Sequence, residues 1–220
     1  MLHPTEPPIL YKFGKMATNQ GVIVEIGSWK GLSTCLLAKG SMANNRVPVH
    51  AVDTFQFTEF GKDRKINTYP DFEKNIEKMN VKNIIRAHIG ESEVVAKSFN
   101  LPISVLFIDG SHDYENVLKD VLNWTPKVVE GGWIAFHDTD YEGVMKVIKE
   151  LILKSGDYSN LNYIGSLIWA QKEKGSNIKN YYNLFKRNFV IGLWNILSPN
   201  MKKKVRIILN KEWKVNETDV

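Results

Sequence analysis

Two clusters of hydrogen-bonding side chains each follow an apolar segment of strand type. The segment Ser104–Ile108 ends at Asp109, and the segment Gly132–Phe136 ends at His137 and Asp138. If these segments are adjacent parallel strands, the three side chains meet at one edge of a sheet. Two carboxylates and an imidazole can bind a divalent cation, with oxygen ligands suiting Mg²⁺ and the histidine favouring Mn²⁺, Fe²⁺ or Zn²⁺. Alternatively, the two acids cap loops and contact a ligand without a metal.

His112 lies three residues after Asp109 and is the candidate general base. An imidazole can take up a proton near neutral pH, so it suits the removal of a proton from a hydroxyl group. Ser111, His112 and Asp113 could instead form a polar turn before a helix that begins near Tyr114. The neighbouring cation site favours the catalytic interpretation.

A glycine-containing turn follows the strand-like segment Val22–Ile26 and leads directly into a helix. Its pattern, from Glu25 to Ser33, is Glu-x-Gly-x-x-x-Gly-x-Ser, which differs from the Gly-x-Gly-x-x-Gly of dinucleotide-binding turns. Glycines let a ligand approach the backbone closely, and the N–H groups at a helix N-terminus bind polar or anionic groups. The turn therefore predicts a nucleotide-like ligand. Asp53, at the end of the next strand-like segment, can accept hydrogen bonds from a ribose diol, although it could also cap a helix or lie at the surface.

Strand-like and helical segments alternate from Ile9 to about Lys172, which is typical of a parallel sheet covered by helices on both faces. The predicted strands are Val22–Ile26, Val47–Val52, Ile84–His88, Ser104–Ile108, Gly132–Phe136, Leu161–Gly165 and Leu167–Gln171. The predicted helices are Ile9–Asn19, Gly31–Lys39, Tyr69–Met79, Ser92–Phe99, Tyr114–Val129 and Tyr141–Lys154. The last two strands are one residue apart and fit an antiparallel pair. Thr54–Asn67 has no clear period and is predicted to be a ligand-contacting loop.

The glycine turn resembles motif I of the class I S-adenosylmethionine (SAM) methyltransferases. Residues 108–115 and 131–138 resemble a broad bacterial methyltransferase group that carries Ile-Asp-Gly-x-His-x-Tyr-Glu and a later Gly-Gly-x-x-x-x-His-Asp. The spacing of the acids is also similar to that of divalent-metal-dependent O-methyltransferases, such as catechol O-methyltransferase and the sugar O-methyltransferases of antibiotic pathways. The resemblance covers about residues 20–172. It implies an α/β fold with a Rossmann-like, doubly wound, seven-stranded and mostly parallel sheet, helices on both faces and an antiparallel last strand.

The resemblance also implies roles for individual residues. The acid and glycines of motif I hold the methionine end of SAM, and the turn at Ser92 borders the adenine, although Ser92 is equally a natural helix N-cap. The residues expected to bind the cofactor are Glu25, Gly27, Ser28, Gly31, Ser33, Asp53, Ser92 and Asp109. The expected metal ligands are Asp109, His137 and Asp138, with His137 standing where the family more often has a carboxylate. His112 falls where the catechol enzymes carry a general-base lysine.

Together these residues predict SAM-dependent methyl transfer to a hydroxyl group of a small molecule, such as a sugar or another vicinal diol. A divalent metal of the Mg²⁺ or Mn²⁺ type would assist, with His112 and Asp109 as catalytic residues. A nicotinamide-dependent oxidoreductase on a similar sheet is an alternative, but the dinucleotide fingerprint is missing. A non-catalytic SAM-fold module that is tethered to a partner or membrane is a further alternative.

The composition fits a globular protein: 43% of the 220 residues are hydrophobic and 24% are charged. The single cysteine, Cys35, excludes an internal disulfide. Residues 1–8 lack the basic and apolar regions of a signal peptide, and the apolar run 189–197 is too short to span a bilayer. We therefore expect a cytoplasmic protein.

The net charge of +5 is concentrated near the C-terminus, since residues 171–220 contain eleven Lys or Arg residues against four acids. We expect a methyltransferase domain at residues 1–174 and a basic amphipathic extension at 175–220. The extension could contact an anionic membrane peripherally, pack on the core or form the seam of a homo-oligomer. No nucleic-acid partner is expected, because the Asn/Asp-Pro-Pro-Tyr/Phe signature of amino-methylating enzymes is missing.

Overall fold

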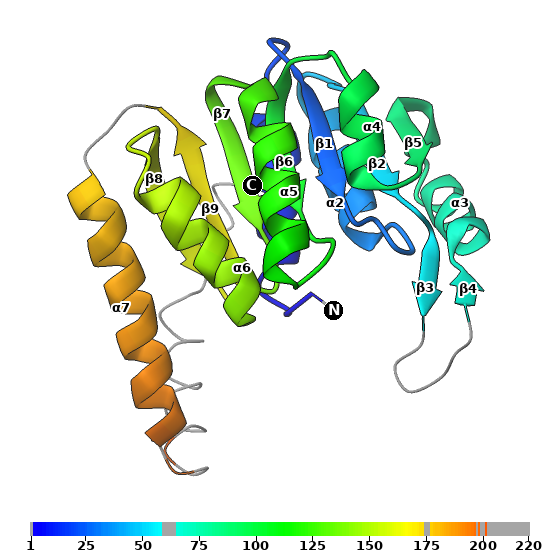
Figure 1. The fold of residues 1–220 in the computed structure, drawn as a ribbon. Helices are drawn as coiled ribbons and strands as arrows, with labels where there is room; N and C mark the ends of the chain where they lie inside the picture. The colour runs from blue at the N-terminus through cyan, green and yellow to red at the C-terminus, as the bar shows by residue number, and fades with distance from the viewer. Residues whose placement is uncertain (1, 59–64, 174–176, 197, 199–200, 202–220) are drawn as a thin grey trace. The chain divides into compact units, whose positions relative to one another are not determined.

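The computed structural model describes residues 2–58, 65–173, 177–196, 198 and 201. The chain divides into two compact units, residues 1–181 and 182–220, and the division falls within one helix. The predicted site lies entirely in the first unit, and the fold of that unit is the one that matters for function (Figure 1).

A seven-stranded sheet forms the centre of the first unit, with the strand order β5-β2-β1-β6-β7-β9-β8. The first five strands in this order are parallel, and β9 runs antiparallel to both of its neighbours. The strands are β1 Val22–Ile26, β2 Val49–Asp53, β5 Ile85–Ile89, β6 Ile103–Ile108, β7 Val128–Phe136, β8 Tyr158–Ile164 and β9 Leu167–Lys172. This arrangement confirms the predicted Rossmann-like fold and places the carboxyl ends of the parallel strands at one edge.

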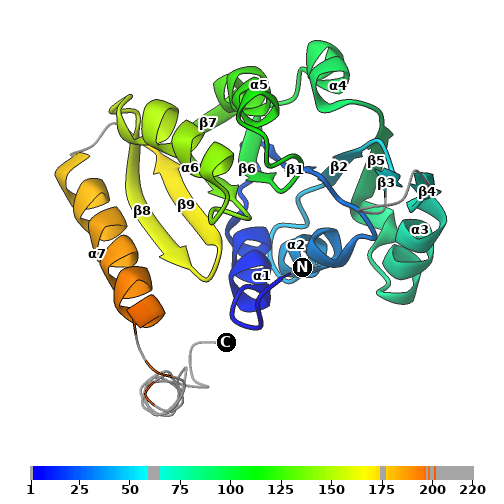
Figure 2. The ribbon, with the colours of Figure 1, turned by 60° about the horizontal axis from the view of Figure 1, so that its bottom comes forward.

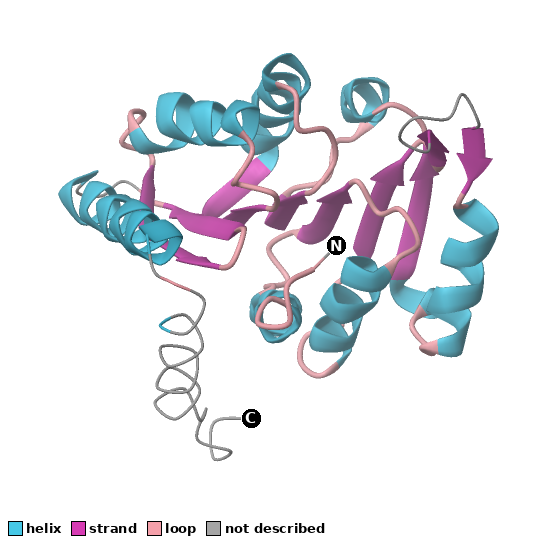
Figure 3. Ribbon diagram, turned by 90° about the horizontal axis from the view of Figure 1, so that it is seen from below, coloured by secondary structure: helices cyan, strands magenta, loops and turns pink. Residues whose placement is uncertain are grey.

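Helices cover both faces of the sheet, as Figures 2 and 3 show. One face carries α1 Pro7–Met16, α2 Leu32–Met42 and α3 Tyr69–Lys78, and the other carries α4 Ser92–Ser98, α5 Tyr114–Trp124 and α6 Glu142–Val147. Short helical turns follow at η1 Lys82–Ile84, η2 Thr125–Lys127 and η3 Ile148–Leu153. Because both faces are covered, every residue of β6 is buried, as an apolar central strand requires.

Two sequence-based expectations for this unit are wrong. The helix expected at Tyr114–Val129 ends at Trp124, because Pro126 cannot donate a backbone hydrogen bond and Val128 already begins β7. The segment Thr54–Asn67, expected to be a loop, contains two short strands: β3 Gln56–Thr58 pairs antiparallel with β4 Lys65–Asn67, and residues 59–64 lie outside the described residues. The predicted helix at 141–154 is present as α6 followed by the π-helical turn η3.

The helix α7, Asn177–Ile196, begins in the first unit and continues into the second. Its first turn is attached to β8, since Asn180 accepts the backbone N–H of Leu161 (3.1 Å) and donates to the carbonyl of Tyr158 (2.8 Å). Among the described residues, no helix has the length and apolar character needed to cross a bilayer. The boundary at residues 174/175 stays a prediction, and the basic stretch 202–206 lies outside the described residues.

Candidate active site

A cavity of about 770 Å³ opens at the carboxyl ends of the parallel strands. That volume is within the ordinary range for sites that bind small molecules and cofactors. The predicted site residues that line it are Gly27, Ser28, Ser33, Asp53, Ser92, Asp109, His112 and Asp138. The turn after β1, the acid after β2 and the polar clusters after β6 and β7 therefore face one space.

The glycine turn is packed tightly against the end of β6. Gly27 has a φ of 84°, and a Cβ added there would lie 2.2 Å from the backbone oxygen of Asp109. Gly31 has a φ of 83°, and a Cβ there would lie 2.8 Å from the ring of Phe72. Both positions therefore require glycine for two reasons, the left-handed backbone and the lack of space. Of these two glycines, Gly27 lines the cavity, whereas Gly31 faces Phe72.

Asp53 holds the glycine turn by hydrogen bonds to the backbone. Its Oδ2 accepts the N–H groups of Ser28 and Trp29, each at 2.7 Å, and its Oδ1 accepts the N–H of Phe55 at 2.7 Å. A carboxylate offers about four lone-pair positions, so Asp53 retains capacity for a ligand hydroxyl group. Its ribose-binding role stays a prediction.

Glu25 lies beneath the turn instead of in the cavity. Its side chain is fully buried, and its Oε2 accepts hydrogen bonds from the hydroxyls of Ser28 (2.8 Å) and Thr34. Burial raises the pKa of Glu25 to about 7, although hydrogen bonds from Ser33, Thr34 and Ser28 act in the opposite direction. The contacts in the structure shape the turn, and a direct contact with the cofactor stays a prediction.

Ser92 is the first residue of α4, and Glu91 occupies the N-cap position. The Ser92 hydroxyl accepts a hydrogen bond from the indole N–H of Trp124 at 2.8 Å. Asp120, which the sequence analysis missed, lines the cavity from α5, and burial raises its pKa to about 6. Asp120 and Ser92 together make the part of the cavity beside α4 and α5 polar.

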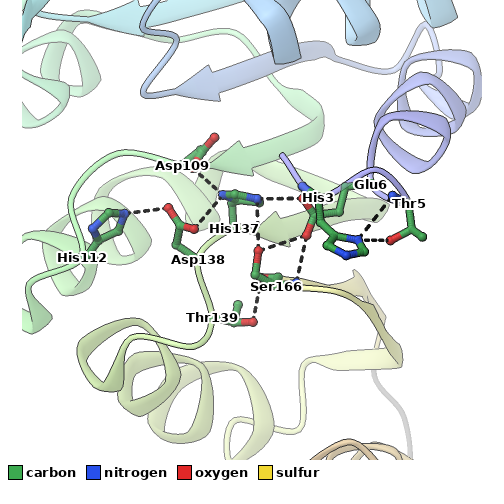
Figure 4. A network of polar contacts seen from close by, with 9 residues as sticks. All are labelled: His3, Thr5, Glu6, Asp109, His112, His137, Asp138, Thr139 and Ser166. Carbon is green, nitrogen blue, oxygen red and sulfur yellow. Dashed lines mark hydrogen bonds and ion pairs between the residues drawn. The ribbon is translucent and has the colours of Figure 1, made fainter. Parts of the chain in front are cut away.

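The structure brings Asp109, His137 and Asp138 together (Figure 4). Nδ1 of His137 lies 3.0 Å from Oδ1 of Asp109 and 3.2 Å from Oδ1 of Asp138. The cause is the register of β6 and β7, in which Ile108 pairs with Phe136, so that the next residues of the two strands are neighbours. One ligand atom from each of the three side chains lies within 4.8 Å of the others.

This donor set fits a divalent cation. Nδ1 of His137 is buried and close to two carboxylates, yet neither contact has the alignment of a hydrogen bond. Nε2 of the same ring lies 3.0 Å from Oε2 of Glu6. A metal-binding histidine typically directs one nitrogen at the ion and donates the other N–H to a carboxylate. The two nitrogens of His137 face groups that could serve in this way. Without a cation, burial disfavours the imidazolium, but the contacts with Asp109, Asp138 and Glu6 raise the pKa of His137 to about 11.

His112 lies beside this cluster, at the wall of the cavity. Its Nε2 is 2.8 Å from Oδ2 of Asp138, and its ring stacks on Tyr141 at 4.1 Å with an interplanar angle of 11°. The side chain is 40% exposed. Asp138 and Tyr141 thus hold the imidazole by its edge and its face, which leaves Nδ1 for a ligand.

Comparisons with known proteins give a family and related folds for this chain. A family model described as a methyltransferase domain matches residues 24–139. An uncharacterized protein of Acanthamoeba polyphaga mimivirus, R132, is 31% identical over 144 residues, and the alignment covers 62% of this chain and 62% of that protein.

Solved structures share the fold at low identity. The O-methyltransferase NovP is 18% identical, with a TM-score of 0.64 over 76% of this chain and 79% of that chain. An O-methyltransferase from Bacillus cereus in complex with SAH is 18% identical, with a TM-score of 0.58 over 78% of this chain and 83% of that chain.

Proposed function

The chain belongs to the methyltransferase-domain family, and from that premise we propose that it transfers the methyl group of SAM to a hydroxyl group of a small molecule. The family match confirms the membership expected from the glycine turn. The observation that carries the proposal is that one cavity is lined both by this turn and by His112 with its neighbouring carboxylates.

The methyl donor would occupy the side of the cavity formed by the glycine turn. Gly27 and Ser28 line this side of the cavity, and Asp53 and Ser92 offer polar atoms at the ends of β2 and β5. The similarity to an O-methyltransferase that is described in complex with SAH supports SAM as the methyl donor.

The acceptor would lie against the other side. Asp109, His137 and Asp138 would hold a cation of the Mg²⁺ or Mn²⁺ type, which when bound would bind the acceptor hydroxyls and lower their pKa. Exposed apolar side chains of Trp29, Leu32 and Phe57 line the same cavity on the side of the glycine turn. The proposed acceptor class is a compound with vicinal hydroxyls, such as a sugar or a catechol, because two neighbouring oxygens can bind one cation.

The reaction would be an in-line displacement. The acceptor oxygen forms a bond to the methyl carbon, the bond from that carbon to sulfur breaks, and SAH leaves. The protein must hold oxygen and carbon about 3–3.5 Å apart. His112 would take the hydroxyl proton on Nδ1, while Asp138 holds its Nε2–H and stabilises the imidazolium that forms.

The test is an assay with methyl-labelled SAM and a panel of sugars, sugar nucleotides and catechols, with and without a chelator. We expect transfer to a hydroxylated acceptor, its loss on chelation and its return with Mg²⁺ or Mn²⁺. Transfer that survives chelation would refute the cation's role. Tight binding of NAD in place of SAM would refute the function itself.

Peripheral membrane contact, homo-oligomerisation and a cytoplasmic location stay predictions. Exposed aromatic side chains on α7 at Tyr182, Phe185 and Phe189 are compatible with a membrane or protein contact. Flotation with anionic vesicles and the measured mass in solution would separate these alternatives.

A further inference from the structure

Glu6 is a buried acid outside the predicted site that reaches into it from the segment before α1. Its side chain is fully buried, and its carboxylate lies behind the candidate cation site, on the far side of the His137 ring from Asp109 and Asp138 (Figure 4). The two residues are 131 positions apart in the sequence.

The groups around this carboxylate are hydrogen-bond donors. Oε2 accepts the backbone N–H of His3 at 2.6 Å and faces Nε2 of His137 at 3.0 Å. Oε1 accepts the backbone N–H of Ser166 at 2.9 Å and its hydroxyl at 3.0 Å. Three donors of His3 and Ser166 point at this carboxylate, so it acts as an acceptor, and Nε2 of His137 is the fourth group that can donate to it.

The turn between β8 and β9 packs closely against the carboxylate of Glu6. Gly165 has a φ of 56°, and a Cβ added there would lie 2.6 Å from Oε1 of Glu6. The next residue, Ser166, also lies 3.2 Å from Nε2 of His137 through its hydroxyl. The N-terminal segment, this turn and the end of β7 therefore meet at one point, the Nε2 atom.

We propose that Glu6 is a positioning residue for His137: it holds Nε2–H and so directs Nδ1 at Asp109 and Asp138. A ring held at one nitrogen cannot rotate, so the other nitrogen keeps its place between the two aspartates. Asp138 also contacts His112, so the orientation of His137 bears on the position of the His112 ring as well. The part that concerns the cation rests on the proposed function, whereas the orientation of His137 does not.

Glu6→Gln is the direct test, because the amide keeps the size but places an N–H₂ group against donors. In 15N-histidine-labelled, metal-free protein, we expect the Nε2 proton of His137 to give a slowly exchanging imidazole resonance, which His137→Gln identifies by its loss. Glu6→Gln should abolish or strongly shift this resonance. Thr5→Ala, an adjacent change in the same segment, should leave it in place.

Binding of Mn²⁺, followed by electron paramagnetic resonance, gives a second readout without turnover. We expect Glu6→Gln to weaken Mn²⁺ binding about 10–100-fold. In the His137→Gln background, Glu6→Gln should cause no further loss, because Glu6 acts through His137. The proposal would be overturned if Glu6→Gln reduced the affinity for Mn²⁺ equally in the wild type and in His137→Gln. An unchanged Nε2 resonance in Glu6→Gln would overturn it too.

The outcomes separate this proposal from the proposed function. If the wild type binds no Mn²⁺, the cation's role fails and the Nε2 resonance alone decides on Glu6. If Glu6→Gln does not fold, Ser166→Ala replaces it and should weaken Mn²⁺ binding several-fold and speed exchange of the Nε2 proton. No change in either measurement would then overturn the proposal.

Discussion

Oδ2 of Asp138 lies 2.8 Å from Nε2 of His112, while Oδ1 of the same carboxylate lies 3.2 Å from Nδ1 of His137. One side chain thus connects the candidate base to the candidate cation site. Asp138 adopts a φ of 53°, a left-handed conformation that aspartate tolerates better than most residues. The contact with the imidazole of His137, which outweighs burial, lowers the pKa of Asp138 to about 2. The carboxylate is therefore ionised and able to orient both rings.

Replacing His112 by Gln should lower the rate of methyl transfer about 10²–10⁴-fold, the usual contribution of a general base. The affinity for SAM should remain unchanged, because His112 acts on the acceptor. Single-turnover rates and SAM binding by calorimetry measure the two effects separately. Asp113→Asn, on the same turn but outside the cavity lining, is the matched control. A His112→Gln protein with the wild-type rate would remove His112 from the mechanism.

Asp53→Asn should weaken SAM binding at least about tenfold, which corresponds to roughly 1.4 kcal/mol. The reason is that an amide cannot accept all three backbone N–H groups that the carboxylate now holds. Calorimetric titration with SAH measures the change without turnover. Asp71→Asn, which removes an exposed acid paired with Lys30, should leave the affinity unchanged. Equal affinities for all three proteins would show that Asp53 does not organise the cofactor site.

Gly27→Ala should lower the free energy of unfolding by about 3 kcal/mol or more, because the new Cβ meets the backbone oxygen of Asp109. Gly131→Ala is the matched control, since Gly131 also has a positive φ (76°) but has open space, with only the Gln171 amide at 4.0 Å. Gly131→Ala should lower the free energy of unfolding by only about 1–2 kcal/mol, the cost of placing an alanine in the left-handed conformation. Denaturant unfolding measures both values. Similar losses would mean that the close packing of the turn on β6 is unimportant.

His50 should make the protein sensitive to acid. Its ring lies 2.8 Å from His88, and burial, together with His88 and Arg86, lowers the pKa of His50 to about 4. In the unfolded chain His50 takes up a proton near pH 6.5, whereas in the folded protein it does so only near pH 4. The contribution of the neutral His50 ring to the free energy of unfolding is therefore fully present above pH 6.5 and is lost as the pH falls towards 4. The loss is up to about 1.4 kcal/mol per pH unit.

The check is the free energy of unfolding of wild type and His50→Gln between pH 7.5 and 4.5. The advantage of the wild type should shrink as the pH falls. Glu25 and Asp120, whose raised pKa values act in the opposite sense, are present in both proteins and cancel. A constant difference across the range would contradict the prediction, and His3→Gln, at an exposed histidine, is the control.

The sheet and the cluster at its edge were predictable because the signal is local. The apolar segments before Asp109 and His137 are long enough to define β6 and β7, and the carboxyl ends of neighbouring parallel strands must meet. Asp120 carried a signal that was not used: it is an acid on the buried face of α5, between Val117 and Trp124.

Glu6 and the pair of His50 and His88 carried no such signal. Glu6 reaches His137 only because the segment before α1 lies against the β8–β9 turn, and no periodicity encodes that placement. The two histidines lie diagonally across β2 and β5, so their contact depends on a register that the sequence does not specify. The hairpin at β3 and β4 was missed because each strand has only three residues.

The identity of the atom that receives the methyl group tests the proposed function most directly. After incubation with SAM that carries a 13C-labelled methyl group, the carbon spectrum of the product distinguishes a methyl ether from an N-methyl or S-methyl group. We expect a methyl ether formed by the wild type, and little or none formed by Asp109→Asn or His112→Gln at equal SAM occupancy. Methylation of nitrogen or sulfur, or ether formation by both variants at the wild-type rate, would contradict the proposal.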